Sequence, residues 1–236
     1  MGQFQIKIAG HVATVTHLFD STKHYCAAYL TQEPGEVFIS VTREDLEAEQ
    51  ALLLEEALRE KIRPRVFAEP FLERSVIQRK LAEALLPYDI LLLHGSAVAV
   101  DGKGYLFTAD CGTGKSTHTR FWRETFGSRA VMVNDDKPFL QITDGMVFLC
   151  GAPWSGKHGL DTNLTVPLKG ICILCRGTEN RIWRISPEDA LPMLRKQCNA
   201  PDRPLVNWLC EAVPLWQMEC TKNPQAAEVS YQAMSQ

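Results

Sequence analysis

A glycine-rich segment near the middle of the 236-residue chain has the composition of a loop that binds phosphate groups. Its residues are Ala109, Asp110, Cys111, Gly112, Thr113, Gly114, Lys115 and Ser116, with Thr117 directly behind them. The general pattern is G-x-x-x-x-G-K-[ST], and Ala109 replaces only its first glycine. Gly112 and Gly114 let backbone N–H groups turn inward as an anion-binding nest. We therefore expect residues 109–117 to hold the phosphates of a nucleoside triphosphate, with Lys115 on the terminal phosphates and the Ser116 hydroxyl on Mg²⁺.

Two adjacent aspartates, Asp135 and Asp136, follow an apolar segment at residues 130–133. P-loop proteins place a Mg²⁺-binding aspartate at the end of such a strand. One carboxylate can hold the metal, directly or through water, and the other can take a proton from an acceptor hydroxyl. Lys115 and Asp135 are 20 residues apart, which leaves room for one helix and a returning strand. A pair of aspartates that caps a turn is the alternative.

Two further residues, His94 and Lys157, are weaker candidates for the same site. His94 precedes Gly95 and interrupts an apolar run, and the next predicted strands lead into the phosphate loop. A core histidine with satisfied hydrogen bonds is equally compatible with that position. Lys157 lies in a glycine-bearing loop at residues 153–159, where a fixed cation could stabilise transferred charge. A surface turn with a packed Trp154 is the alternative for this loop.

Composition and charge exclude several classes of function. The formal net charge is -3, which gives no sign of an electrostatic search for nucleic acid. We see no secretory signal and no apolar run long enough to span a bilayer. The chain is therefore expected to be cytoplasmic, with reduced cysteines, no nucleic-acid partner and no membrane partner. Assembly into a homo-oligomer stays open.

The predicted elements divide the chain into three parts. Residues 1–88 form a small α+β region, with strands in the first forty residues, a strand pair at 25–30 and 36–41, and helices at 46–62 and 74–86. Thr42 and Asp45 have the spacing of a capping box at the first of these helices. Residues 89–222 form the P-loop core, and residues 223–236 form a polar tail that frays.

Within the core, the predicted strands and helices place the phosphate loop. Strands at 90–100 and 104–109 flank the turn Asp101-Gly102, a hairpin signal. The loop then leads into a helix at 116–125, so strand, loop and helix follow in the order that phosphate binding requires. Strands at 138–142 and 146–150 form a second hairpin, and strands at 168–175 and 181–185 flank a later turn. Helices are expected at 187–197 and 205–210.

These residues resemble the catalytic domain of HPr kinase/phosphorylase, in the wider phosphoenolpyruvate-carboxykinase-like group of P-loop folds. The resemblance spans residues 90–185 and rests on His94-Gly95, the Asp101-Gly102 hairpin, the segment 108–116, and Val133 to Asp136. It implies an α/β fold with a mixed-sheet P-loop core, behind a small α+β region. It also implies ATP and Mg²⁺ as ligands, Lys115 on the phosphates, Ser116 and Asp136 near the metal, and Asp135 as the base.

Two classes of function follow from this comparison. The first is a kinase that transfers a phosphoryl group to a hydroxyl of an unidentified protein or small molecule. Its candidate catalytic residues are Asp135, Lys115, His94 and Lys157, and its metal ligands are Ser116, Asp135 and Asp136. HPr kinases also carry a Glu before an Arg-Gly pair. In this chain Lys169-Gly170 corresponds to the Arg-Gly pair, but the Glu is missing, and Asp161 or Asn163 could replace it. The missing acid favours the second class, a non-catalytic nucleotide-binding accessory protein, for example in peptide maturation.

Overall fold

The structure is a computed structural model that describes residues 2–59 and 63–236. The chain divides into two compact units, Met1–Leu85 and Leu86–Gln236. Ile62, the last residue of a helix expected from the sequence, lies outside the described residues. None of the helices in the described part of the chain is both long and apolar enough to cross a membrane.

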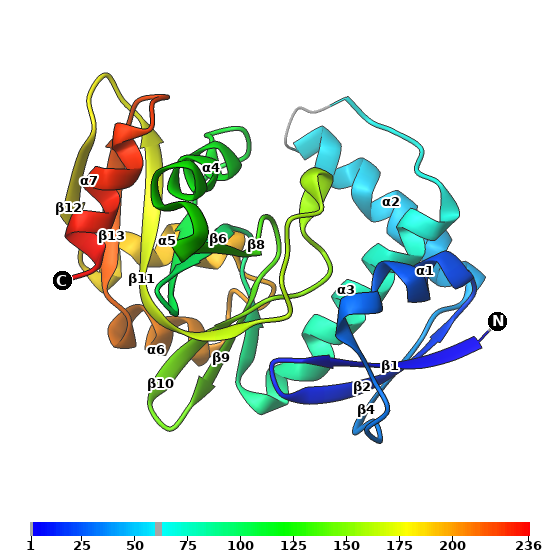
Figure 1. Cartoon of the computed structure of the whole chain (residues 1–236). Helices are drawn as coiled ribbons and strands as arrows, with labels where there is room; N and C mark the ends of the chain where they lie inside the picture. The colour runs from blue at the N-terminus through cyan, green and yellow to red at the C-terminus, as the bar shows by residue number, and fades with distance from the viewer. Residues whose placement is uncertain (1, 60–62) are drawn as a thin grey trace. The chain divides into compact units, whose positions relative to one another are not determined.

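The N-terminal unit is a small sheet with helices (Figure 1). Within residues 2–59 and 63–85, the strands have the order β3-β1-β2-β4. Their bounds are β1 Gly2–Ile8, β2 His11–His17, β3 Leu30–Thr31 and β4 Val37–Ser40. The helices are α1 Asp20–Tyr25, α2 Arg43–Arg59 and α3 Glu69–Leu85, with a 3-10 turn η1 at Ala27–Tyr29.

The capping box before α2 and the strand expected at 36–41 are confirmed, but the strand expected at 25–30 and the pairing of these two segments are wrong. The backbone N–H of Thr42 donates to Asp45 Oδ2 at 2.8 Å, and the N–H of Asp45 donates to Thr42 Oγ1 at 3.3 Å. Residues 27–29 form η1 instead of a strand, and β4 pairs in parallel with β2. The Pro34-Gly35 segment therefore connects strands that are not neighbours, which local turn signals do not reveal.

The C-terminal unit is built on a mixed sheet, as the sequence predicted. Within residues 86–236, all of which are described, its main path runs β5-β9-β10-β11-β7-β6-β8, and β13 joins β11 to β12. The strands are β5 Ile90–Leu92, β6 Ser96–Val100, β7 Lys103–Thr108, β8 Ala130–Asn134, β9 Phe139–Thr143, β10 Met146–Cys150, β11 Thr165–Arg176, β12 Arg181–Arg184 and β13 Leu215–Cys220. β7 is antiparallel to β6 and parallel to β11.

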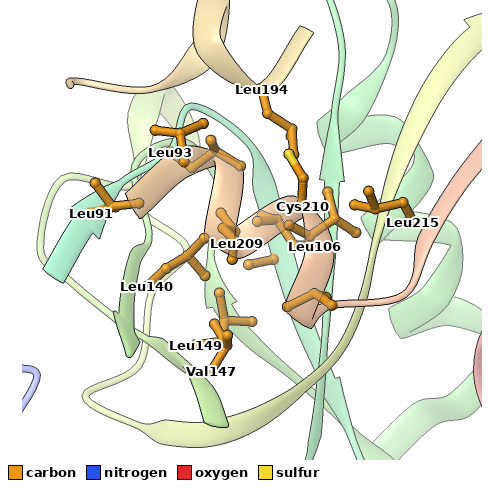
Figure 2. Close-up of a cluster of buried hydrophobic side chains, with 14 of the residues drawn as sticks. Leu91, Leu93, Leu106, Leu140, Val147, Leu149, Leu194, Leu209, Cys210 and Leu215 are labelled. Carbon is orange, nitrogen blue, oxygen red and sulfur yellow. The ribbon is translucent and has the colours of Figure 1, made fainter. Parts of the chain in front are cut away.

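Helices cover both faces of this sheet. The helices are α4 Lys115–Phe126, α5 Pro187–Gln197, α6 Pro204–Ala212 and α7 Gln225–Met234, and short 3-10 turns are η2 Leu86–Tyr88, η3 Gly127–Arg129 and η4 Gly156–His158. Leu106 packs with Leu194 of α5 and Leu209 of α6 on one face (Figure 2). Its neighbours Tyr105 and Phe107 pack on the other face, with residues of α4 and α7. This alternation buries β7 on both sides, and the packing therefore fixes the position of its carboxyl end, which leads into residues 109–116.

Several predicted boundaries change in this unit. The run 90–100 is two strands, because His94-Gly95 separates β5, which pairs with β9, from β6, which pairs with β7. β12 does not pair with β11; β13 lies between them, a strand that the sequence did not predict. The tail expected to fray contains α7, whose Ala226, Ala227 and Met234 are buried.

Candidate functional site

The candidate phosphate loop, residues 109–116, connects the end of β7 to the start of α4. Gly112 has φ +74° and Gly114 has φ +124°, conformations that residues with a Cβ rarely adopt. A Cβ added at either glycine would meet nothing within 4 Å, so backbone conformation and not crowding selects glycine there. Ala109 is not among the positive-φ residues and is fully buried in the core. An alanine in place of the first glycine therefore fits this loop.

Lys115 begins α4 and folds back over the loop. Its Nζ donates to the carbonyl oxygen of Ala109 at 3.0 Å. Burial lowers the pKa of Lys115, and the charges of Cys111, Asp136 and Asp110 act in the opposite direction. The N-cap residue of α4 is Gly114, which has no side chain to bind the first N–H groups. The amino end of α4 thus combines a lysine with uncapped backbone donors, an arrangement suited to anions.

Asp135 is buried against the first turns of α4. Its Oδ1 accepts a hydrogen bond from Ser96 Oγ at 2.6 Å, and only 7% of the residue is exposed. Ser96 Oγ lies 2.7 Å from Thr119 Oγ1, which is 3.3 Å from the carbonyl oxygen of Ser116. This chain of contacts fixes one aspartate beside the helix that carries Ser116.

Asp136 faces a different group, the imidazole of His94. His94 Nε2 lies 3.3 Å from Asp136 Oδ1, and the side chains are 27% and 35% exposed. Burial acts to raise the pKa of Asp136, but the hydrogen bond from His94 and the charges of Lys137 and Lys115 outweigh it, so its pKa is lowered. Asp136 therefore interacts with both His94 and Lys115, while the neighbouring Asp135 makes separate contacts.

Asn134 organises the turn that presents both aspartates. Its Oδ1 accepts hydrogen bonds from the backbone N–H groups of Asp136 and Lys137, at 2.8 and 2.6 Å. Its Nδ2 donates to the carbonyl oxygens of Ala152 and Trp154. Asn134, and not the aspartate pair, therefore caps this turn, and the turn presents the two carboxylates at the end of β8.

The loop that carries Lys157 passes beside this turn. A Cβ added at Gly156 would lie 3.2 Å from Asp136 Cβ, so the backbone approaches that aspartate closely. Trp154 is buried, as the packed-turn interpretation expected, and Lys157 is exposed in η4. Lys157 therefore follows Gly156, whose backbone lies close to Asp136. Its side chain is exposed, and no contact holds its ammonium group at the described phosphate loop.

Asp161 lies near the aspartate pair through its backbone. It forms an isolated bridge with Asn134, and its Oδ1 accepts a hydrogen bond from Ser155 Oγ. The sequence offered Asp161 or Asn163 as replacements for the missing acid. Asp161 therefore lies at the same end of the sheet as the aspartate pair, but one of its carboxylate oxygens already accepts a hydrogen bond from Ser155.

Three residues at this site were not recognised from the sequence. Ser96 and Thr119 support Asp135, and Arg176 Nη2 donates to the carbonyl oxygen of Gly112 at 2.6 Å. Ser96 directly follows His94-Gly95, so strand alternation could have indicated it. Thr119 is one helical turn after Ser116. Arg176 is 64 residues from Gly112, and only the strand order brings them together.

The residues fit a nucleotide with one Mg²⁺, but they do not form a dedicated metal cage. Within residues 2–59 and 63–236, no group of three or more His, Cys, Asp or Glu side chains is arranged to hold a metal ion. Magnesium bound with a nucleotide needs few protein ligands, because phosphate oxygens and water supply the rest. Ser116 with Asp135 or Asp136 offers such a small set of oxygen ligands, and no atom beyond the chain neighbours lies within 4 Å of a Cβ added at Gly112 or Gly114.

Comparisons with known proteins add a distant likeness. No protein-family profile matches the chain, and no curated protein matches it. Solved structures do match, among them the Hpr(Ser) kinase/phosphatase from Coxiella burnetii, with 12% sequence identity and a TM-score of 0.38. That match covers 60% of this chain and 95% of the other. A likeness at this score does not support a function, so the chain's own geometry must carry the assignment.

Proposed function

We propose that the chain binds a nucleoside triphosphate with Mg²⁺ at residues 109–116 and transfers the terminal phosphoryl group to a hydroxyl of a protein or small molecule. The observation that carries the proposal is the meeting of three groups. Lys115 belongs to the loop, Asp136 lies in the turn that follows β8, and His94 precedes β6. Asp136 joins the other two, because it lies 3.3 Å from His94 and interacts electrostatically with Lys115.

The binding step rests on the loop and on α4. The backbone N–H groups of Gly112 and Gly114 and the amino end of α4 would hold the phosphates, while the N–H of Thr113 donates to the carbonyl oxygen of Asp110 within the loop. Lys115 would leave the Ala109 carbonyl for a phosphate oxygen, a stronger partner for an ammonium group than a neutral acceptor. Mg²⁺ would be held by Ser116 and Asp135, and would neutralise charge on the transferred phosphoryl group.

The surroundings of the two aspartates favour exchanging the roles that the resemblance implied. Asp135 is buried beside α4 and fixed by Ser96, a position suited to orienting the metal or its water. Asp136 is more exposed and is paired with His94, so an acceptor hydroxyl can approach it. We assign the proton-accepting role to Asp136, which takes the hydroxyl proton as the oxygen forms its bond to phosphorus and the bond to the leaving diphosphate breaks.

The test is phosphoryl transfer from labelled ATP to proteins and metabolites of a cell extract, with Mg²⁺ present. We expect label to pass to an acceptor with the parent protein and to be lost with Lys115→Ala. Asp136→Asn should bind ATP but transfer at a rate lower by about 100-fold or more. Transfer by Asp136→Asn at the parent rate would remove the assigned base.

A second function is favoured by one observation, the engagement of Asp161 by Ser155. If no other acid completes the site, the chain would bind nucleotide without turnover and act as an accessory protein. The same experiment separates the two functions. Binding that depends on Lys115, with no labelled acceptor and no ATP consumption in any extract, would favour the accessory protein.

A further inference from the structure

A second cation lies at the candidate phosphate loop, on the strand that runs beside β7. β11 and β7 are parallel, and their pairing runs from Leu168 opposite Gly104 to Ile173 opposite Thr108. Thr108 is the last residue of β7, so both strands deliver the chain to the same edge of the sheet. Arg176 ends β11 three residues beyond the last pair, and it is therefore beside the loop.

The Arg176 side chain contacts the loop at its backbone. Nη2 donates to the carbonyl oxygen of Gly112 at 2.6 Å. That bond uses one of the five N–H donors of a guanidinium group. The residue is exposed, and it forms no ion pair with a carboxylate in the described ranges 2–59 and 63–236. A fixed positive charge therefore stands at the loop with most of its donors available.

Lys196 also contacts the loop, but it behaves differently and provides a comparison. Its Nζ pairs with Oδ1 of Asp110, two residues before Gly112. That contact neutralises the lysine charge within the protein. The contact of Arg176 with a neutral carbonyl oxygen leaves its charge uncompensated. A phosphate oxygen is the acceptor that guanidinium groups match best in both charge and geometry.

We propose that Arg176 binds the phosphates of the nucleotide that the 109–116 loop holds, while its bond to Gly112 fixes the guanidinium at the loop. The inference rests on the proposed function, since it needs a nucleotide at this loop. It adds a phosphate-contacting residue to Lys115 and supplies, within the same chain, the kind of arginine charge that stabilises phosphoryl transfer in other P-loop proteins. Arg176 would thus contribute to both nucleotide affinity and transfer.

The alternative is that Arg176 only supports the loop backbone, and two substitutions separate the possibilities. Arg176→Gln keeps an N–H donor for the Gly112 carbonyl but has no charge. Arg176→Lys keeps a charge but has no planar fork. Arg181→Ala is the matched control, because it removes an exposed arginine from β12, where Arg181 lies over the ring of Trp183.

The measurement is calorimetric titration of each full-length variant with MgATP at low and high salt. We expect Arg176→Gln to weaken binding by about 10- to 100-fold, the usual range for a hydrogen bond to a charged group. Arg176→Lys should lose less affinity for MgATP than Arg176→Gln, and Arg181→Ala should bind MgATP as the parent does. The affinity of Arg176→Gln should depend less on salt concentration than that of the parent. Unchanged melting temperatures without nucleotide would show that each variant folds.

Binding by Arg176→Gln within twofold of the parent would overturn the inference and leave Arg176 as a support for the loop. Lys115→Ala belongs in the same series, since it tests the proposed function separately. If Lys115→Ala abolishes binding and Arg176→Gln binds as the parent does, only the inference fails. If the parent protein binds no nucleotide, both fail.

Discussion

His94 Nε2 lies 3.3 Å from Asp136 Oδ1, although His94 precedes β6 and Asp136 lies in the turn after β8. β6 and β8 are antiparallel neighbours, so the start of β6 meets the end of β8, with Ala97 opposite Asn134. The N–H of Gly95 also donates to the carbonyl oxygen of Asp136 at 3.0 Å. The segment just before the hairpin that leads into the candidate phosphate loop therefore places a histidine beside the carboxylate that we assign as the proton acceptor.

The pair of His94 and Asp136 should control transfer more than binding. We expect His94→Ala to lower the rate of phosphoryl transfer by about 10-fold or more and to change its pH profile, because the carboxylate of Asp136 loses its partner. Affinity for MgATP, measured by calorimetry, should change by less than about threefold, a small energy on this scale. An unaltered rate and pH profile would contradict a role for the pair.

Ser96 should stabilise the fold through Asp135. Ser96→Ala leaves Oδ1 of a buried carboxylate without its donor, which costs about 1–3 kcal/mol in the free energy of unfolding. Ser128→Ala, at an exposed position in η3, is the matched control and should cost less than about 0.5 kcal/mol. Denaturant titration measures both, and equal stability of the two variants would show that the Ser96 contact contributes nothing.

Cys111 should report occupancy of the loop. It is the exposed member of the eight cysteines, all of which are described, and the others are buried or partly buried. We expect a maleimide reagent to label Cys111 first and MgATP to slow that labelling, since the nucleotide would cover the loop. Mass spectrometry of digested protein identifies the site. Equal labelling of Cys111 with and without MgATP would speak against a ligand at this loop.

His118 should make stability depend on pH. Burial lowers the pKa of His118 from 6.5 to about 3. In the folded protein, His118 Nε2 accepts a hydrogen bond from Trp122 Nε1 and contacts Ser230 Oγ. Between these two values the unfolded chain binds a proton that the folded chain does not, so the free energy of unfolding falls as pH falls.

The slope from this one group approaches about 1.4 kcal/mol per pH unit. His118→Gln should remove it, whereas His24→Gln, at an exposed position, should keep it. Denaturant titrations at several pH values between 3 and 6.5 measure the slope. The same slope in His118→Gln as in the parent would mean that the buried imidazole is not its source.

Local signals in the sequence predicted much of the core. The Asp101-Gly102 turn, the strand before the loop and the helix after it are confirmed, because each depends on neighbouring residues. The mixed sheet is also confirmed, since a hairpin into the loop requires it. The helix expected at 187–197 matches α5, where Ser186 caps the first turn by accepting from the N–H of Asp189.

Other features depend on contacts between distant residues and were not predictable. β13 has little alternation in hydrophobicity, and its pairing with β11 and β12 fixes it as a strand. The polar segment after Asn223 forms α7 because Ala226, Ala227 and Met234 are buried in the core shared with α4. Local composition does not reveal such tertiary partners. Arg176 was missed for the same reason, since only the order of strands brings it to Gly112.

The most direct measurement of the central claim is calorimetric titration of MgATP into the full-length protein and into two lysine variants. Lys115→Ala removes the cation of the loop, and Lys103→Ala removes an exposed lysine at the start of β7. We predict saturable binding to the parent and to Lys103→Ala, and loss of nearly all binding in Lys115→Ala. Equal binding to all three proteins, or binding to none, would contradict a nucleotide site at residues 109–116.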